Sequence, residues 1–289
     1  MTGVETLPVA ATAPGATRRR VRWSLSVAVA WAVLIVVLAV FADILPIAGY
    51  DQPVAGAATP PFQSWPEFLG TDDIGRSVLS RVIYGTRVSL TVSVIATAVG
   101  LGAGTLAGLA AAYFRGPVAA VIGLVSDVML AFPVLVLLLA VAAVIRPSMI
   151  SLAVLLGVIS VPACQRVAAA NTRAQLGREY VLAARELGVP GPRLLLREVL
   201  PNIMNSLFAF GFLLVAFFMV FEGALDFLGV GVPPPRPSWG AMIATGVPNI
   251  ETEPYIVFVP ATVLFLTVFA FNTIADRLRE RLDERWTQI

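Results

Sequence analysis

Apolar residues fall into six long runs along the chain, separated by shorter polar stretches. Each run is close to or longer than the ~20 residues that a helix needs to cross the hydrocarbon core of a bilayer. The spacing predicts an all-α membrane protein with six transmembrane helices. The runs cover residues 24–42, 88–112, 118–145, 150–170, 206–232 and 255–273.

The composition agrees with this pattern and narrows the chemistry. Of the 289 residues, 58% are hydrophobic and 13% are charged, against about 25% charged in soluble domains. All 20 basic residues are arginine, and histidine is absent. Without lysine the chain cannot form the phosphate-binding loop G-x-x-x-x-G-K-[ST]. We therefore expect any ATP hydrolysis to take place on another chain.

Several other function classes lose support. The sequence offers no Ser/His/Asp set, metal-ligand cluster or nucleophile motif, so we expect no enzyme activity, no cofactor and no bound metal. The net charge is only +2, and the arginines gather at the predicted membrane edges, which argues against a nucleic-acid partner. The single cysteine, Cys164, lies in the fourth run, so an intrachain disulfide is impossible. We interpret it as a small apolar filler.

The arginines also predict the orientation, because an excess of basic residues marks the cytoplasmic side. Arg18, Arg19, Arg20 and Arg22 precede the first run. With the N-terminus inside, six spans place 15 arginines inside and five outside. Both termini are therefore expected in the cytoplasm.

This topology divides the chain into five parts. We expect a cytoplasmic tail over 1–22, disordered where it is rich in Ala, Thr and Pro, and a first transmembrane helix over 23–45. The alternative at this end, a cleaved signal peptide, has an apolar core of only ~7–15 residues, shorter than this run. An extracytoplasmic connector with an amphipathic segment follows over 46–87. A core of five transmembrane helices covers 88–276, and a cytoplasmic tail covers 277–289.

The stretch "GTDDIGRSVLSRVIYGTRVSL" has two interpretations. Ile74, Val78, Val82 and Ile83 recur at helical spacing, as in an amphipathic helix lying at the membrane surface. Equally, the stretch is a lead-in to the second span. In either case Asp72 or Asp73 is able to cap the helix.

A charged segment interrupts the apolar pattern between the fourth and fifth runs. On a helical wheel, residues 178–188 separate into a charged arc and an opposite arc that combines small residues with a few large ones. A Pro-Gly-Pro break then ends the helix, and a second helix leads into the fifth run. Lipid docking gains nothing from Ala or Gly, so a protein partner fits the second arc better than headgroups do. That arc holds Tyr180, Val181, Ala183, Ala184, Leu187 and Gly188.

The stretch "AARELGVPGPRLLLREVLP" resembles the EAA loop of ABC importer permeases. It departs from the pattern at Leu182, where Glu is usual and nearby Glu179 is able to supply the carboxylate, and at Glu198, where an aliphatic residue is usual. The resemblance implies that the loop, over 171–202, couples the spans to cytoplasmic ATPases. The residues implied in coupling are Glu179, Ala183, Ala184, Leu187, Gly188, Leu200 and Pro201.

Three further stretches resemble the second permease subunit of dipeptide, oligopeptide and nickel importers: "GTDDIGRSVLSRVIYGTRVSL", "GVPPPRPSWG" and "FNTIADRLRERLD". The resemblance implies a six-helix type I permease in a bacterial inner membrane, most often for di- or oligopeptides. Its implied partners are lipid, a homologous permease, two ATPase subunits that bind ATP and Mg, and an extracytoplasmic binding protein. By hypothesis, that protein docks on Asp72, Arg76, Pro234, Ser238 and Trp239.

Three carboxylates lie inside predicted spans, where charges are costly and usually face the bundle interior or water. Asp127 is interpreted first as a hydrogen-bonding group for a neighbouring helix. Glu222 and Asp226 are spaced i, i+4 and share one face. Water, a cation or a shared proton is needed to stabilise them in lipid, unless they bond a neighbouring helix. Our hypothesis is that all three line the translocation path and that Glu222 and Asp226 favour cationic groups such as a peptide amine.

Two remaining expectations follow from the spans. Gly100, Gly104 and Gly108 have the small-xxx-small spacing of helix packing surfaces. The rival function is a proton-coupled secondary transporter that uses Asp127, Glu222 and Asp226 as a relay. The absence of histidine, the lack of visible internal repeats and the charged cytoplasmic segment argue against it.

Overall fold

The computed structural model describes residues 14–63, 67–114, 116–145 and 148–286, with the backbone alone for 14–22 and 281–286. Its long helices are joined by shorter helices and irregular loops. The helices are α1 (Pro14–Phe41), α2 (Val78–Tyr113), α3 (Pro117–Ala131), α4 (Val134–Ala142), α5 (Met149–Leu176), α6 (Glu179–Glu186), α7 (Gly191–Arg193), the π-helical turn η1 (Leu194–Val199), α8 (Leu200–Phe227), α9 (Trp239–Gly246), the 3-10 turn η2 (Val247–Asn249) and α10 (Tyr255–Trp286).

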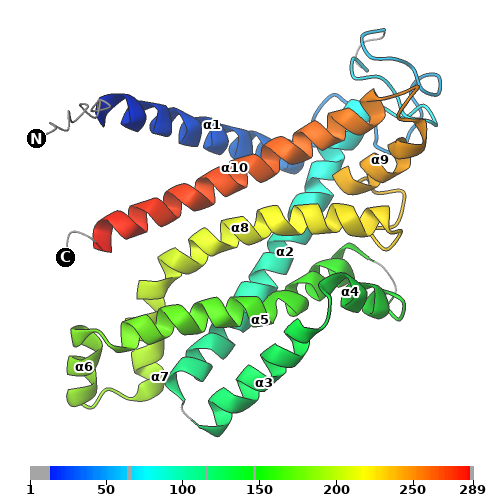
Figure 1. Cartoon of the computed structure of the whole chain (residues 1–289). Helices are drawn as coiled ribbons and strands as arrows, with labels where there is room; N and C mark the ends of the chain where they lie inside the picture. The colour runs from blue at the N-terminus through cyan, green and yellow to red at the C-terminus, as the bar shows by residue number, and fades with distance from the viewer. Residues whose placement is uncertain (1–13, 64–66, 115, 146–147, 287–289) are drawn as a thin grey trace, which may run out of the picture.

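The long helices run between two ends of an elongated bundle (Figure 1). The start of α1, the end of α10 and α6 lie toward one end, at the left of the view, which we call the coupling end. The connector 42–77 and α9 lie at the opposite end, at the upper right. Five helices are long and apolar enough to cross a membrane, and the bent pair of α3 and α4 supplies a sixth crossing if it counts as one span. The all-helical prediction is confirmed.

Glycines bring α2 and α5 into close contact, as the small-xxx-small spacing predicts. A Cβ on Gly104 would lie 2.4 Å from the Cβ of Cys164, and one on Gly108 would lie 2.6 Å from that of Ala168. Gly100 faces Ser160 and the backbone of Gly157 in the same way. Each approach is possible only without a side chain at the glycine, so the three glycines set the distance between the two helices.

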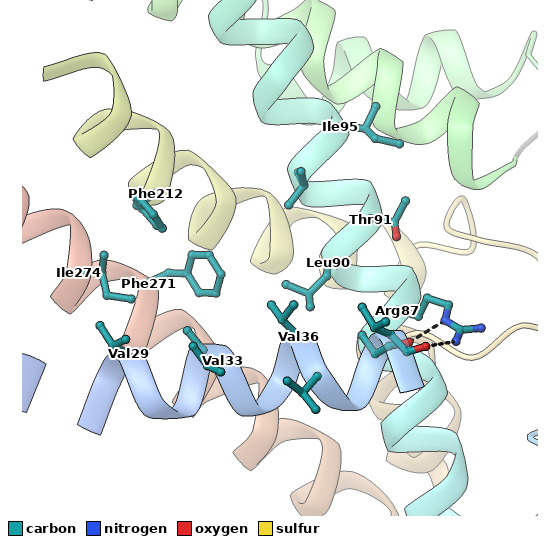
Figure 2. A pocket seen from close by; sticks show the side chains of 15 residues that line it. Val29, Val33, Val36, Arg87, Leu90, Thr91, Ile95, Phe212, Phe271 and Ile274 are labelled. Atoms are coloured by element: carbon teal, nitrogen blue, oxygen red, sulfur yellow. Dashed lines mark hydrogen bonds between the residues drawn. The ribbon is translucent and has the colours of Figure 1, made fainter. Parts of the chain in front are cut away.

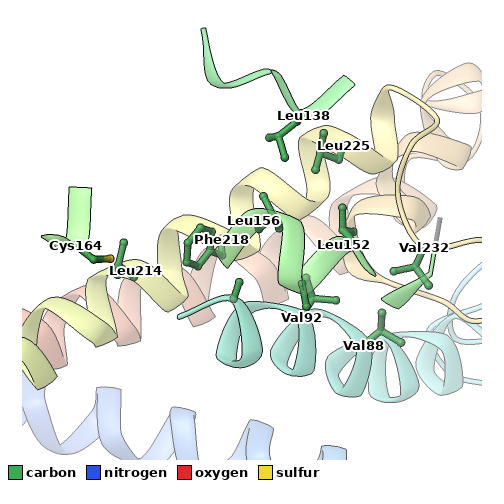
Figure 3. Packing of buried hydrophobic residues seen from close by; sticks show 12 residues of the cluster. Val88, Val92, Leu138, Leu152, Leu156, Cys164, Leu214, Phe218, Leu225 and Val232 are labelled. Carbon is green, nitrogen blue, oxygen red and sulfur yellow. The ribbon is translucent and has the colours of Figure 1, made fainter. Parts of the chain in front are cut away.

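The largest buried cluster joins α2, α4, α5 and α8 (Figure 3). In Figure 3, Phe218 of α8 lies beside Leu156 of α5, and Leu225 of α8 lies beside Leu138 of α4. Cys164 belongs to this cluster, is fully buried and has a free thiol. Its interpretation as an apolar filler agrees with this position.

The third predicted span, 118–145, is broken. Phe132 and Pro133 separate α3 from α4, and the two helices are bent by 86°. Pro133 lacks the N–H of a continuing helix and forces Phe132 into an extended conformation, with φ −84° and ψ 136°. The single transmembrane helix predicted over this run is therefore two helices joined at a bend.

The stretch before the second span is a lead-in, and the alternative of a separate surface helix is wrong. Helix α2 begins at Val78 and continues without a break to Tyr113, and Val78, Val82 and Ile83 are buried. The N-cap is Ser77, whose side chain accepts a hydrogen bond from the N–H of Ser80. Neither Asp72 nor Asp73 caps this helix, in contrast to the prediction.

Both predicted tails are partly helical. Helix α1 begins at Pro14 and α10 continues to Trp286, so these two helices extend beyond the predicted boundaries at 22 and 277. The remainder of the N-terminal tail, residues 1–13, lies outside the described residues, and so do 287–289.

Helix α1 leans against α10 and α2 and leaves an apolar groove of about 810 Å³. Figure 2 shows Val29 and Val33 of α1 pointing into it, opposite Phe271 of α10. At one end of the groove, Arg87 of α2 donates hydrogen bonds to two carbonyls near the end of α1, and its guanidinium lies 3.0 Å from the Asp43 carboxylate. These bonds fasten the end of α1 to α2.

Candidate functional site

Helix α6 is the short helix between the fourth and fifth predicted spans, and glycine ends it. The N–H of Gly188 donates to the carbonyl of Arg185, and the N–H of Val189 donates to that of Ala184. This pair of bonds is the Schellman motif, which requires a left-handed residue after the helix. Gly188 has a φ of +76°, so a residue without a Cβ suits this position best.

One face of α6 packs on the rest of the chain through Val181. Val181 is fully buried in a cluster with Leu109 of α2, Ala168 of α5 and Leu194 and Val199 of η1, and Ala184 is half-buried against the same cluster. The interpretation of this whole arc as a surface for a partner is therefore correct only in part. Part of the small-residue surface that we assigned to a partner is covered by the chain itself.

The opposite face of α6 is free in this chain and includes large apolar side chains. Leu187 is 84% exposed and Leu182 is 47% exposed, with Ala183 exposed beside them. Glu179 and Gly188 are also exposed. Leu182 is thus exposed within the charged arc, where the sequence placed it, and Ala183 and Leu187 form a separate exposed apolar strip beside Glu179 and Glu186.

The connection from α6 to α8 is almost entirely helical. After Pro190, helical backbone runs from Gly191 through η1 into α8, so that Gly191–Phe227 forms one long apolar helix. Leu200 is half-buried and Pro201 is exposed at the start of α8. A π-helical turn such as η1 is uncommon and is often found at functional sites. Helix α6 thus packs against the helical segment that continues into α8.

Two contacts that involve tyrosine side chains hold α6 in place, and neither was predicted from the sequence. The guanidinium of Arg185 lies 5.8 Å from the ring centroid of Tyr113, at the end of α2. The Tyr180 hydroxyl donates to Oε1 of Gln175 at 2.9 Å. Partial burial, together with the charge of Glu198, raises the pKa of the Tyr180 hydroxyl, so it remains protonated as a donor. Only the tertiary fold brings these partners together.

At the opposite end of the bundle, Glu222 and Asp226 fasten α8 to α2 and α9. Glu222 is fully buried and accepts a hydrogen bond from the Ser89 hydroxyl at 3.1 Å. Asp226 accepts one from the N–H of Val232 at 3.0 Å and another from the Ser238 hydroxyl. Both carboxyl groups therefore bond to neighbouring elements of this chain, which is the alternative that the sequence left open beside the translocation path.

Asp127 does not join that pair. It lies on an exposed side of α3 and forms an ion pair with Arg166 of α5 at 2.6 Å. The interpretation of Asp127 as a bonding group for a neighbouring helix agrees with this contact. A proton relay needs its carboxylates in sequence along one path. Glu222 and Asp226 interact with each other, but Asp127 is paired with Arg166 and joins neither of them. The arrangement offers no support for the secondary transporter.

The five residues assigned to binding-protein docking separate into two groups. Trp239 and Ser238 are fully buried: the indole N–H of Trp239 donates to the carbonyl of Val82 at 3.0 Å, and Ser238 caps α9. Asp72 is buried and bonds the N–H of Arg76 and its guanidinium at 2.9 and 2.7 Å. Pro234 is exposed and Arg76 is partly exposed. Docking on Ser238 and Trp239 as side-chain contacts is therefore incorrect for this conformation, because both lie inside the chain.

Comparison with known proteins agrees with this geometry. Residues 100–288 match the family described as binding-protein-dependent transport system inner membrane component. The di/tripeptide transport system permease protein DppC of Pseudomonas aeruginosa is 37% identical over 233 residues, which cover 78% of this chain and 76% of the relative. The glutathione transport system permease protein GsiD of Pectobacterium atrosepticum is 34% identical over 218 residues, covering 75% and 72%. GsiD of Escherichia coli O157:H7 is 33% identical over 259 residues, covering 88% and 84%. With its helical spans, its type I permease fold and this similarity, the chain belongs to the family of binding-protein-dependent transport system inner membrane components.

Proposed function

We propose that this chain is a transmembrane permease subunit of an ATP-driven ABC importer for peptides, and that it forms half of the translocation path. The observation that carries the proposal is α6. Its inner side chain, Val181, is buried against η1 and α8, while Leu182 and Leu187 on its outer face have no cover from the described part of the chain. Exposed apolar side chains on a helix that packs against a membrane span are suited to contact another protein.

The partner at the coupling end is an ATPase dimer, which binds the ATP and Mg. Closure of the dimer on ATP moves α6, and because α6 is packed on the helix that continues into α8, the span moves with it. The arginine distribution supports a cytoplasmic location for this end, in a bacterial inner membrane. A homologous permease completes the path, and an extracytoplasmic binding protein delivers the solute at the opposite end.

Peptides are the substrate class that the relatives support, since they include permeases named for di/tripeptide and for glutathione transport. This chain contributes the path and the coupling helix, and catalyses no reaction of its own. The choice of peptide belongs mainly to the binding protein.

Purification and reconstitution test the proposal. The tagged chain, extracted from its native membrane, is expected to bring a second permease and an ATPase with it. The reconstituted complex, with its binding protein, is expected to take up dialanine only when ATP is supplied. Purification of the chain alone, with peptide uptake driven by a proton gradient and unaffected by ATP, would establish the secondary transporter instead.

A further inference from the structure

A pocket of about 320 Å³ lies at the end of the bundle opposite α6. Its walls come from four parts of the chain: the residues before α2 and its first turn, the end of α8, the proline-rich loop that follows, and α9. Three consecutive prolines, 233–235, form one wall, and their fixed φ angles limit its movement. The volume is at the lower end of the ~300–1,000 Å³ of small-ligand sites.

Three arginines line this pocket, and the first two share one carboxylate. The Nε of Arg76 lies 2.7 Å from Oδ2 of Asp72, and the Nε of Arg81 lies 3.4 Å from the same oxygen. Arg81 also donates to the carbonyl of Tyr50 at 3.2 Å. Asp72 therefore balances one of these two guanidinium charges.

The other carboxylate of the pocket, Asp226, is already engaged. It accepts hydrogen bonds from Val232 and Ser238, and it forms no ion pair within the described residues. The third arginine, Arg236, is exposed at the wall and makes no hydrogen bond or ion pair with any described residue. The lining therefore carries three guanidinium groups and one carboxylate, and Arg236 is the guanidinium that has no partner among the described residues.

We infer that this pocket binds the carboxylate of a small solute, with Arg236 as the principal contact. A guanidinium presents a planar set of N–H donors that matches the two oxygens of a carboxylate. Arg76 and Arg81 supply further positive charge on the facing wall, and the prolines exclude part of the water. If the proposed function is correct, the solute is a peptide and the group is its C-terminal carboxylate.

The charge of the pocket opposes the hypothesis drawn from the sequence. A peptide amine in this pocket would meet three guanidinium groups, and the one carboxylate of the lining, Asp226, has its oxygens in hydrogen bonds to the chain itself. Like charges at close range disfavour binding. The pocket therefore selects for an anionic group and against a cationic one.

Chemical protection of arginine tests the site without depending on transport. The complete transporter in nanodiscs, without its binding protein, is treated with phenylglyoxal, and modification of each arginine is followed by mass spectrometry. Dialanine at millimolar concentration is expected to slow modification of Arg236 several-fold, whereas dialanine amide is not. Arg87, whose guanidinium lies outside the pocket, is the internal reference and is expected to react at one rate throughout. Equal rates at Arg236 with both peptides overturn the inference.

Uptake separates this inference from the proposed function. With each peptide supplied as a saturated complex with the binding protein, Arg236→Gln is expected to lower dialanine uptake about tenfold, the value of one charged hydrogen bond, and to leave the amide unchanged. Arg236→Lys retains the charge and is expected to restore part of the loss. If dialanine protects Arg236 but the wild type shows no ATP-driven uptake, the proposed importer function is wrong and the carboxylate site in the pocket stands. Weaker docking of the binding protein in Arg236→Gln, with equal losses for both peptides, shows a protein contact and overturns the carboxylate site.

Discussion

At the scale of single residues, the backbone conformation of Gly188 limits what can replace it. A Cβ built on Gly188 meets no atom within 4 Å, yet its φ is +76°. An L side chain in this left-handed conformation costs about 1–2 kcal/mol, and Asn tolerates it better than other residues. We expect Gly188→Ala and Gly188→Leu to weaken the end of α6 and lower ATP-driven uptake to a similar extent.

Gly188→Asn is the matched control and should retain most of the uptake. Uptake, ATPase activity and the amount of ATPase bound are measured for all three variants. A different outcome, in which Leu uncouples hydrolysis from transport while Ala behaves as wild type, would assign the effect to overpacking in the ATPase groove, which costs about 1–3 kcal/mol.

The hydrogen bonds of Asp226 predict how its substitution affects the stability of α9. Asp226→Ala leaves the Ser238 hydroxyl and the Val232 N–H without their acceptor, and each unsatisfied buried group costs about 1–3 kcal/mol. Hydrogen exchange across α9 should therefore become faster in Asp226→Ala, and change much less in Asp226→Asn, which keeps an acceptor oxygen. If exchange is unchanged in both variants and Asp226→Asn lowers uptake only of substrates that have an amine, Asp226 lines the translocation path instead.

At the scale of helices, the contact between α2 and α5 depends on glycine at particular positions. In Gly104→Ala, the new Cβ would lie 2.4 Å from the Cβ of Cys164 and 2.9 Å from the backbone nitrogen of Gln165. We expect a loss of about 1–3 kcal/mol from this overpacking, measured as a lower midpoint of thermal unfolding in detergent.

Gly102→Ala is the control on the same helix, because a Cβ there meets nothing within 4 Å. Alanine is the better helix former by about 1 kcal/mol, so this variant should be neutral or slightly stabilising. Equal destabilisation by both substitutions would mean that flexibility of α2, and not its distance from α5, is the property that glycine provides.

Whether a proline bends a helix of this chain depends on the helices packed around it. Pro133 separates α3 from α4, whereas Pro162 in α5 and Pro260 in α10 lie inside continuous helices. Pro162 and Pro260 are buried among neighbouring helices, which hold the backbone and stabilise the freed carbonyls. Pro133 is exposed, and α3 and α4 each have only one buried residue among those described. Few contacts from the described part of the chain therefore oppose the bend at Pro133.

At the scale of the whole molecule, the exposed side of α3 and α4 differs from a lipid-facing surface. The ion pair of Asp127 and Arg166 has side chains 68% and 56% exposed in the single chain, and charged groups within spans usually face protein or water. We expect the homologous permease to cover this side in the assembled importer.

Spin labels at two equally exposed positions check this arrangement. Leu124 on α3 is 63% exposed and Phe265 on α10 is 65% exposed. In the complete complex, a label on Leu124→Cys should have low accessibility to oxygen dissolved in the lipid, and one on Phe265→Cys should have high accessibility. The buried Cys164 is replaced by serine in both. Equal high accessibility at the two positions would place α3 against lipid and the second permease elsewhere.

The sequence by itself determined the helical spans, the glycine contacts of α2 and the break at Pro190 to Pro192. These features depend on local properties: the length of apolar runs, the spacing of small residues on one helix face, and the missing N–H of proline. For the same reason the sequence located α6, since its residues and its breaking prolines are consecutive in the chain.

Only the tertiary structure decided which side of each element is covered. It turned Val181 inward and Leu182 outward, buried Ser238 and Trp239, and bent the third span at Pro133 while leaving Pro162 in a continuous helix. It also brought Arg76, Arg81 and Arg236 to one pocket, although the last lies far from the first two in the chain. The physical reason is that burial and charge balance depend on neighbours that arrive from distant parts of the sequence, and a local pattern specifies a helix without specifying what packs against it.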